Sequence, residues 1–261
     1  MNNVNQTLYI PLYGKSYVSQ KGIILQDSMA EKIWTAVEFP LKSKSKSKWL
    51  AYYMGMRSAV FDCWTTEQIR KNSDAVVIHL GCGLDSRCQR VTEKMSVWYD
   101  VDFPEVICER QKYYHEDTSY RTIGCDVRDP QLWERVSDGQ SAIVIMEGIS
   151  MYMNPQELET VFSMISRRFE HVALLMDCYS TFAAKASKYK NPINDVGVSQ
   201  VYGLDDPQNV TGASGLSFVR EWDMTPAELI DQLQGTEKPI FKKLYAGKIA
   251  RKMYHLYEYV K

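Results

Sequence analysis

Short apolar runs alternate along the chain with longer stretches in which apolar residues recur at a helical period. The run at 75–80 is rich in β-branched residues and apolar on both faces, as in a strand covered on two sides. This alternation predicts a doubly wound α/β sheet that binds ligands at the carboxyl ends of its strands. Strands are predicted at 75–80, 96–101, 120–124, 141–147 and 171–177, and helices at 86–94, 104–115, 130–136 and 155–169.

The two ends of the chain predict additions to this core. Residues 1–26 are interpreted as a partly irregular arm, and helices are expected from Ser28 to about Phe39, over 49–64 and from Thr65. Asn, Asp, Gly and Pro crowd into 190–215, which we interpret as a lid over the substrate. Two late strands, at 216–222 and 251–260, surround a helix that a capping box opens at Thr225.

We therefore expect a single domain with a mostly parallel seven-stranded sheet and an antiparallel edge strand. Its predicted parts are an N-terminal helical arm (1–70), a cofactor-binding core (71–180), a lid insertion (181–215) and a C-terminal sheet edge (216–261).

Composition narrows the class of protein. The 261 residues carry a net charge of −1, which argues against a nucleic-acid or membrane-surface binder, since these show a basic excess. Neither a signal peptide nor a long apolar span is visible, and the six cysteines form no C-x-x-C pair. We expect a cytoplasmic protein without a metal site, and the oligomeric state stays open.

The centre of the pattern is the turn Gly81-Cys82-Gly83, which follows the first core strand directly. Two glycines lack the Cβ atoms that would hold a ligand away from the backbone. A dinucleotide fingerprint needs a third glycine, and Ser86 stands there instead. This weakens a nicotinamide site and leaves other nucleotide cofactors open.

Polar side chains at the ends of the next strands indicate which cofactor the turn serves. Asp102 can accept both hydroxyls of a ribose, whereas Asp100 is either a second contact or points to the opposite face. Asp126 and the N–H of Val127 suit the edge of an adenine, and Glu147 suits a positively charged group. S-adenosylmethionine carries this combination of groups.

Four stretches together resemble the leucine carboxyl methyltransferase family, which includes the polyketide O-methyltransferases of the tetracenomycin type. The stretches are 79–87 (HLGCGLDSR), 100–106 (DVDFPEV), 124–129 (GCDVRD) and 147–153 (EGISMYM). The resemblance implies a Rossmann-like class I methyltransferase that uses S-adenosylmethionine. It covers about residues 10–180 and fades after that, and a protein-substrate platform cannot be aligned beyond it.

The same resemblance assigns roles to residues of this chain. It places Gly81 against the methionine part of the cofactor, Asp102 on the ribose, Asp126 and Val127 on the adenine, and Glu147 near the amino-acid end. Arg57 matches an arginine that pairs with the methionine carboxylate, and Lys15 matches a lysine of the N-terminal arm. Gly83 and Cys82 complete the cofactor turn, with the thiol of Cys82 as a buried filler.

The leading hypothesis is an O-methyltransferase for a small-molecule carboxylate or hydroxyl, in secondary metabolism. No catalytic base stands out, and Asp177 and Tyr179 after the fifth strand are the candidates for acceptor contact. A protein or peptide carboxyl methyltransferase is the alternative within the same chemistry. A nicotinamide-dependent oxidoreductase and a non-catalytic cofactor-binding module are the alternatives of another class.

Overall fold

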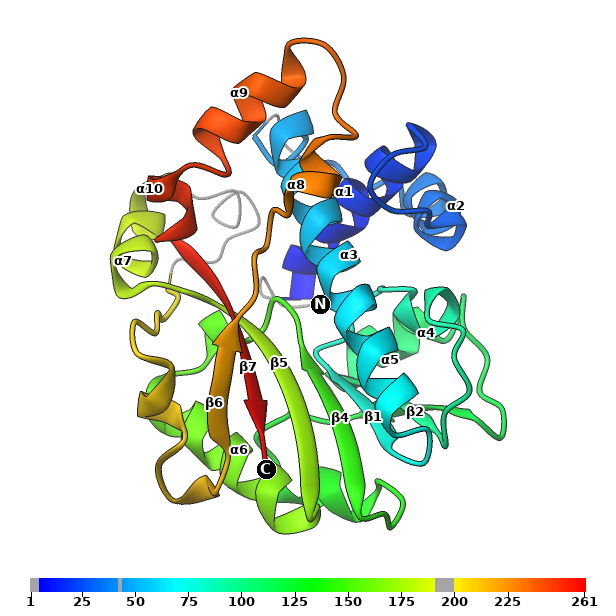
Figure 1. Cartoon of the computed structure of the whole chain (residues 1–261). Coiled ribbons are helices and arrows are strands. Elements are labelled where there is room, and N and C mark those ends of the chain that lie inside the picture. Colours follow the sequence, from blue (N-terminus) through cyan, green and yellow to red (C-terminus); the bar gives the residue numbers. More distant parts are fainter. Residues whose placement is uncertain (1–4, 42–43, 191–199) are drawn as a thin grey trace.

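A seven-stranded sheet forms the centre of the computed structural model, which describes residues 5–41, 44–190 and 200–261 (Figure 1). The strand order is β3-β2-β1-β4-β5-β7-β6, and β7 runs in the direction opposite to the other six strands. This confirms the predicted sheet and its antiparallel edge. The strands are β1 (Val76–Leu80), β2 (Trp98–Asp102), β3 (Tyr120–Gly124), β4 (Ser141–Met146), β5 (His171–Tyr179), β6 (Ser217–Glu221) and β7 (Tyr254–Val260).

Two long helices cover the opposite faces of this sheet. Val77 of β1 belongs to a buried cluster with Phe61 and Trp64 of α3 (Lys48–Lys71). Its neighbour Ile78 belongs to the cluster on the other face, which contains four buried residues of α6 (Pro155–Arg168). Successive strand residues point to opposite faces, so an apolar run without alternation requires both layers. Burying each large apolar side chain contributes about 2 kcal/mol to the fold.

The N-terminal arm is helical rather than irregular within its described residues. After η1 (Asn5–Leu8), α1 (Tyr9–Gln20) packs along α3, and α2 (Ser28–Val37) packs on α1. Gly14 weakens the helix pattern of α1, but a Cβ there would lie 2.8 Å from Cβ of Met54 on α3. Close packing between helices therefore explains a glycine that local propensity counts against the helix. The predicted start of α2 is correct, although its N-cap is Asp27, which accepts from the N–H of Ala30.

The predicted break before Thr65 is wrong, because α3 continues to Lys71. The Thr65 hydroxyl donates to the carbonyl of Phe61 one turn earlier, so it does not cap a new helix. The predicted helix at 155–169 forms as α6, which begins with a capping box of Asn154 and Glu157. The other three predicted core helices are shorter than expected. These three are α4 (Arg87–Arg90), α5 (Pro104–Arg110) and η2 (Pro130–Glu134), and a further short helix, η3 (Ser150–Tyr152), was not predicted.

The C-terminal third departs most from the prediction. Where one helix was expected between the last strands, the chain forms α8 (Ala227–Ile230), α9 (Glu237–Leu244) and α10 (Lys248–Arg251). The predicted capping box at Thr225 is absent, because Pro226 is the N-cap of α8 and no side chain caps it. Helices α8–α10 and the N-terminal helices gather at the end of the sheet where the parallel strands terminate (Figure 1).

Only part of the predicted lid can be assessed, since 191–199 lie outside the described residues. Helix α7 (Thr181–Lys190) follows β5 directly. The short helices η5 (Pro207–Val210) and η6 (Gly212–Ser214) pack against α6 instead of covering the strand ends. Among the described helices, none is both long and apolar enough to cross a membrane.

Candidate active site

A cavity of about 1220 Å³ opens at the carboxyl ends of the parallel strands. Pockets for one drug-sized ligand are about 300–1,000 Å³, so this cavity has room for a cofactor together with a second molecule. The nine cofactor positions predicted from the sequence all line this cavity. They are Lys15, Arg57, Gly81, Cys82, Gly83, Asp102, Asp126, Val127 and Glu147.

The glycine turn forms the floor of the cavity and is attached to β2. Gly81 has φ +69° and Gly83 has φ +52°, a region that disfavours residues with a Cβ. A Cβ on Gly81 would also overlap the side chain of Ile149. The N–H of Gly83 donates to Oδ2 of Asp102 at 2.7 Å. Contact with Ile149 therefore requires a glycine at Gly81, whether or not a ligand also approaches the turn. Cys82 is buried, as predicted for a filler.

Asp102 is the strand-end carboxylate that faces the cavity. Its other oxygen accepts from the N–H of Phe103 at 2.8 Å, and burial raises its pKa to about 6 against the lowering effect of these two bonds. Asp100 does not point to the opposite face, because residues two apart in a strand share a face. It lies deeper and is fully buried, where it pairs with Arg110 and accepts from Tyr120.

Asp126 lines the cavity but shares its carboxylate with Arg128. Its Oδ1 accepts from Nε of Arg128 at 2.9 Å, and its Oδ2 accepts from Nη2 at 2.6 Å. Hydrogen bonding by this guanidinium lowers the pKa of Asp126. Arg128 also reaches Glu157 at 2.8 Å and itself lines the cavity. Arg128 belongs to the motif at 124–129, but no role for it was predicted from the sequence.

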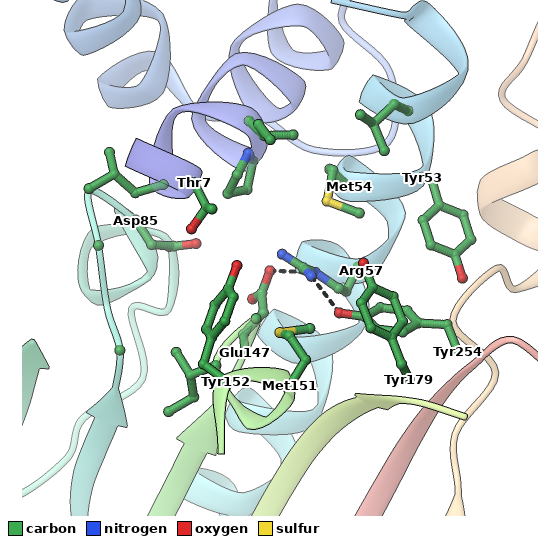
Figure 2. A pocket seen from close by; sticks show the side chains of 18 of the residues that line it. Thr7, Tyr53, Met54, Arg57, Asp85, Glu147, Met151, Tyr152, Tyr179 and Tyr254 are labelled. Carbon is green, nitrogen blue, oxygen red and sulfur yellow. Dashed lines mark hydrogen bonds and ion pairs between the residues drawn. The ribbon is translucent and has the colours of Figure 1, made fainter. Parts of the chain in front are cut away.

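Arg57 and Glu147 form a buried ion pair beside the glycine turn (Figure 2). Nε of Arg57 donates to Glu147 at 3.0 Å, while Nη1 donates to Asp177 and to the hydroxyl of Tyr254, each at 2.9 Å. None of these bonds uses the second terminal nitrogen, Nη2. Burial favours protonation of Glu147, but Arg87 and Arg57 outweigh it and hold the pKa of this carboxyl at about 2.

Asp177 is not an acceptor contact in this arrangement. It is fully buried, does not line the cavity, and accepts from Arg57, from Tyr254 and from the N–H of Gly148. Tyr179, the other candidate, does line the cavity. The carboxylate of Asp177 thus positions Arg57 and Tyr254 from behind, because both of its oxygens are used by groups of the protein.

A network of buried charges supports this end of the cavity, and the sequence analysis did not foresee it. Lys15 pairs with Asp85, which joins α1 of the arm to the glycine turn. Arg87 is fully buried, pairs with Glu147 and donates to Asp62 at 2.6 Å. Asp85 and Arg87 fall within the motif at 79–87, but these partners lie far away in sequence: 70 residues separate Lys15 from Asp85, and 25 separate Asp62 from Arg87.

The other end of the cavity is aromatic and apolar. Tyr254 and Tyr179 pack with ring centroids 4.8 Å apart, and Tyr53 lies 6.3 Å from Tyr254 (Figure 2). Burial raises the pKa of the Tyr254 hydroxyl well above its usual value, so it remains a hydrogen-bond donor. Residues from α7 and α9–α10 complete this end, and none of them was predicted from the sequence: Ala183, Ala186, Leu244 and Ile249. Thr7 and Leu8 of the N-terminal arm also line the cavity, but Leu8 lies at the glycine turn, where its Cβ would be 3.4 Å from a Cβ on Gly83.

Comparisons with known proteins agree with this geometry. The model of the leucine carboxyl methyltransferase family matches residues 6–166. The tetracenomycin polyketide synthesis O-methyltransferase TcmP of Streptomyces glaucescens is 26% identical over 241 residues, or 91% of this chain and 89% of that protein. The S-adenosyl-L-methionine-dependent methyltransferase dpfgK of Gibberella zeae is 24% identical over 67% of this chain and 64% of its own length.

Solved structures show the same fold. Magnesium protoporphyrin IX methyltransferase from Synechocystis PCC 6803, with bound SAH, has a TM-score of 0.51 at 13% identity and covers 90% of this chain and 94% of its own. Geranyl diphosphate methyltransferase, in complex with GPP and sinefungin, has a TM-score of 0.52 at 14% identity, over 86% of this chain and 84% of its own.

The sheet order and the strand-end cavity define a Rossmann-like methyltransferase fold. The chain belongs to the leucine carboxyl methyltransferase family and is an S-adenosylmethionine-dependent methyltransferase. This membership removes the nicotinamide-dependent oxidoreductase and the non-catalytic module as alternatives.

Proposed function

We propose that this enzyme transfers the methyl group of S-adenosylmethionine to an oxygen of a small molecule, either a carboxylate or a hydroxyl. One observation carries the proposal: a charged pocket at the strand ends continues without a break into an aromatic and apolar space. The first part suits the cofactor and the second suits a small organic acceptor. Similarity to a polyketide O-methyltransferase over 91% of the chain supports an oxygen acceptor in secondary metabolism.

The donors and acceptors at the charged end fit S-adenosylmethionine group by group. Asp102 would accept from the ribose hydroxyls, and Asp126 with the Val127 N–H would hold the adenine edge. Nη2 of Arg57 would bind the methionine carboxylate, with Lys15 beside it. Glu147 is ionised and would attract the ammonium group, although the protein's own arginines already use both of its oxygens.

The same lining argues for a carboxylate or an acidic phenol as the acceptor group. The cofactor supplies a methyl group activated by a positive sulfur, so the protein's task is to align the acceptor and exclude water. A carboxylate needs no base for this reaction, whereas a hydroxyl needs a proton acceptor. His79 is a poor proton acceptor, because burial lowers its pKa. Its Nε2 also lies 3.4 Å from the guanidinium of Arg87. The lining tyrosine Tyr254 keeps its proton.

Two measurements test the proposal. Calorimetry with S-adenosylhomocysteine is expected to show binding, and absence of binding would sink the proposal. Methyl-labelled cofactor is then offered with a panel of aromatic acids and phenols, and alkali treatment separates esters from ethers. We expect no requirement for a metal ion, so activity is expected to persist in EDTA. Alkali-labile label on a protein in a cell extract, with none on small acids, would support the protein carboxyl methyltransferase alternative.

A further inference from the structure

The charged side chains at the acceptor end of the cavity are all positive. Among the lining residues from Tyr179 onward, the only charged ones are Lys243 at the end of α9 and Lys248 at the start of α10. Every carboxylate of the described lining lies at the other end, where Lys15, Arg57 and Arg128 accompany it. The acceptor end is therefore cationic without a compensating acid.

The amines of these two lysines also have no partner in the part of the chain that the structure describes. The side chains of Lys243 and Lys248 are exposed, and within the described residues neither makes a hydrogen bond or an ion pair. Two other cations of this segment do make ion pairs. Lys238 pairs with Asp231 at 3.0 Å, and Arg251 pairs with Asp223 at 2.7 Å. A cation at a cavity wall with no protein partner is available to an anionic ligand.

The wall that carries the lysines is fixed to the rest of the enzyme. Phe241 of α9 is fully buried, and its ring meets Tyr52 of α3 at 6.3 Å. Tyr245 stacks on Trp49 at 6.0 Å, and Glu237 pairs with Lys48 at 2.8 Å. Because one face of α9 is anchored in this way, Lys243 occupies a defined position beside the cavity rather than the tip of a loop.

Between the lysines and the tyrosines, the cavity wall is apolar and has several small residues. Leu244 and Ile249 line it and remain 61% and 81% exposed, which is unusual for large apolar side chains. Ala183 and Ala186 of α7 and Ala250 of α10 add little bulk to the same wall. The space suits a flat apolar body whose far end reaches the lysines.

We propose that the acceptor carries a second, anionic group distant from the methylated oxygen, and that Lys243 and Lys248 bind this group. The inference rests on the proposed function and narrows its substrate class to apolar molecules with a carboxylate or a phosphate ester at the far end. Lys243 and Lys248 are then specificity residues, and they take no part in the chemical step.

Matched probes test the proposal on the full-length enzyme loaded with S-adenosylhomocysteine. The probes are 6-hydroxy-2-naphthoate, the monophosphate of 2,6-dihydroxynaphthalene and the neutral 6-hydroxy-2-naphthamide, with binding followed by naphthalene fluorescence. At least one anion is expected to bind about tenfold more tightly than the amide, as charge-assisted hydrogen bonds require. The stronger of the two anions distinguishes a carboxylate from a phosphate ester.

The lysines are then tested directly. The double variant Lys243→Gln/Lys248→Gln is expected to abolish the preference for the anion, while Lys242→Gln/Lys252→Gln, which removes two exposed lysines outside the lining, is expected to keep it. Equal binding of anion and amide, a preference that survives the double variant, or no binding of any probe would each overturn the proposal. Failure to load S-adenosylhomocysteine would instead overturn the proposed function, so the two failures are distinguishable.

Discussion

The two ends of the cavity are built on different physical principles. At the cofactor end, charged groups are buried and paired with one another, as in Arg57 with Glu147 and Lys15 with Asp85. At the acceptor end, the wall is apolar, its lysines have no partner among the described residues, and Leu244 and Ile249 are largely exposed.

This difference separates what must be constant from what can vary. A buried ion pair is costly to break, because the partner left behind is an uncompensated buried charge. Side chains at an open apolar wall can change without that penalty. The cofactor end therefore holds a fixed geometry for one ligand, while the acceptor end can be altered for a different substrate. The following predictions test that contrast, from the largest expected effect to the smallest.

The largest effect is expected from Arg87→Leu at the cofactor end. Arg87 is fully buried and pairs with Asp62 and Glu147, so its loss leaves each of these carboxylates with a single cation. The remaining cations are Arg90 for Asp62 and Arg57 for Glu147. We expect the free energy of unfolding to fall by about 4 kcal/mol, measured by urea denaturation. Arg70→Gln is the control, since Arg70 is 68% exposed in its pair with Glu93 and is expected to matter by less than about 1 kcal/mol. Similar losses for both variants would contradict the contrast.

Gly81→Ala is expected to lower the free energy of unfolding by about 3 kcal/mol and to abolish binding of S-adenosylhomocysteine. The new Cβ meets both the unfavourable φ of +69° and the side chain of Ile149. Gly235→Ala isolates the backbone term, because Gly235 has φ +55° with no atom within 4 Å of a Cβ. The control variant is expected to lose about 1 kcal/mol of its free energy of unfolding and to bind S-adenosylhomocysteine normally. Thermal unfolding and calorimetry report the two effects separately.

Asp102→Ala is expected to weaken binding of S-adenosylhomocysteine by at least about tenfold, since it removes the acceptor for the ribose hydroxyls. Asp102→Asn retains the shape but exchanges the carboxylate for an amide, and it separates charge from packing. Calorimetry measures both variants. Unchanged affinity in Asp102→Ala would remove this residue from the site.

The pH dependence of cofactor binding follows from the raised pKa of Asp102, about 6. Ribose hydroxyls stabilise the ionised form of Asp102, so cofactor binding lowers this pKa. Below about pH 6 binding must therefore displace a proton from Asp102, whereas well above pH 6 no proton is exchanged. Affinity is therefore expected to be constant above about pH 7 and to fall towards pH 5, by up to about tenfold per pH unit. Asp102→Asn is expected to flatten the profile between pH 5 and pH 7. An unchanged slope in that variant would assign the titration to another group.

The smallest effect is expected at the acceptor end, from Ala186→Leu on α7. The larger side chain narrows the apolar wall, and binding of 6-hydroxy-2-naphthoate to the loaded enzyme is expected to weaken about threefold. Affinity for S-adenosylhomocysteine is expected to stay within about twofold, and Ala186→Ser, which is nearly the same size, serves as the control. A larger loss of cofactor affinity than of probe affinity would break the proposed separation of the two ends.

Much of the core could be predicted because its signals are local. The five parallel strands follow apolar runs, and each observed end lies within two residues of its prediction. The helix start at Asn154 was predictable from its capping residues. By contrast, Gly14 concealed helix α1, because the reason for that glycine is Met54 on another helix. The helix predicted from Thr225 corresponds to α8, whereas α9 and α10 were missed. Their segments are short, and an amphipathic face needs a longer helix to be recognised.

The sequence by itself determined the sheet and the glycine turn, and it predicted nine cofactor residues that the structure places around one cavity. These follow from strand periodicity and from residues placed directly after strands, which parallel pairing brings to one edge. Only the tertiary structure decided that Asp177 lies behind Arg57, that Lys15 pairs with Asp85, and that Lys243 and Lys248 line the cavity. These relations join residues far apart in the chain, and no local pattern encodes the packing that brings them together.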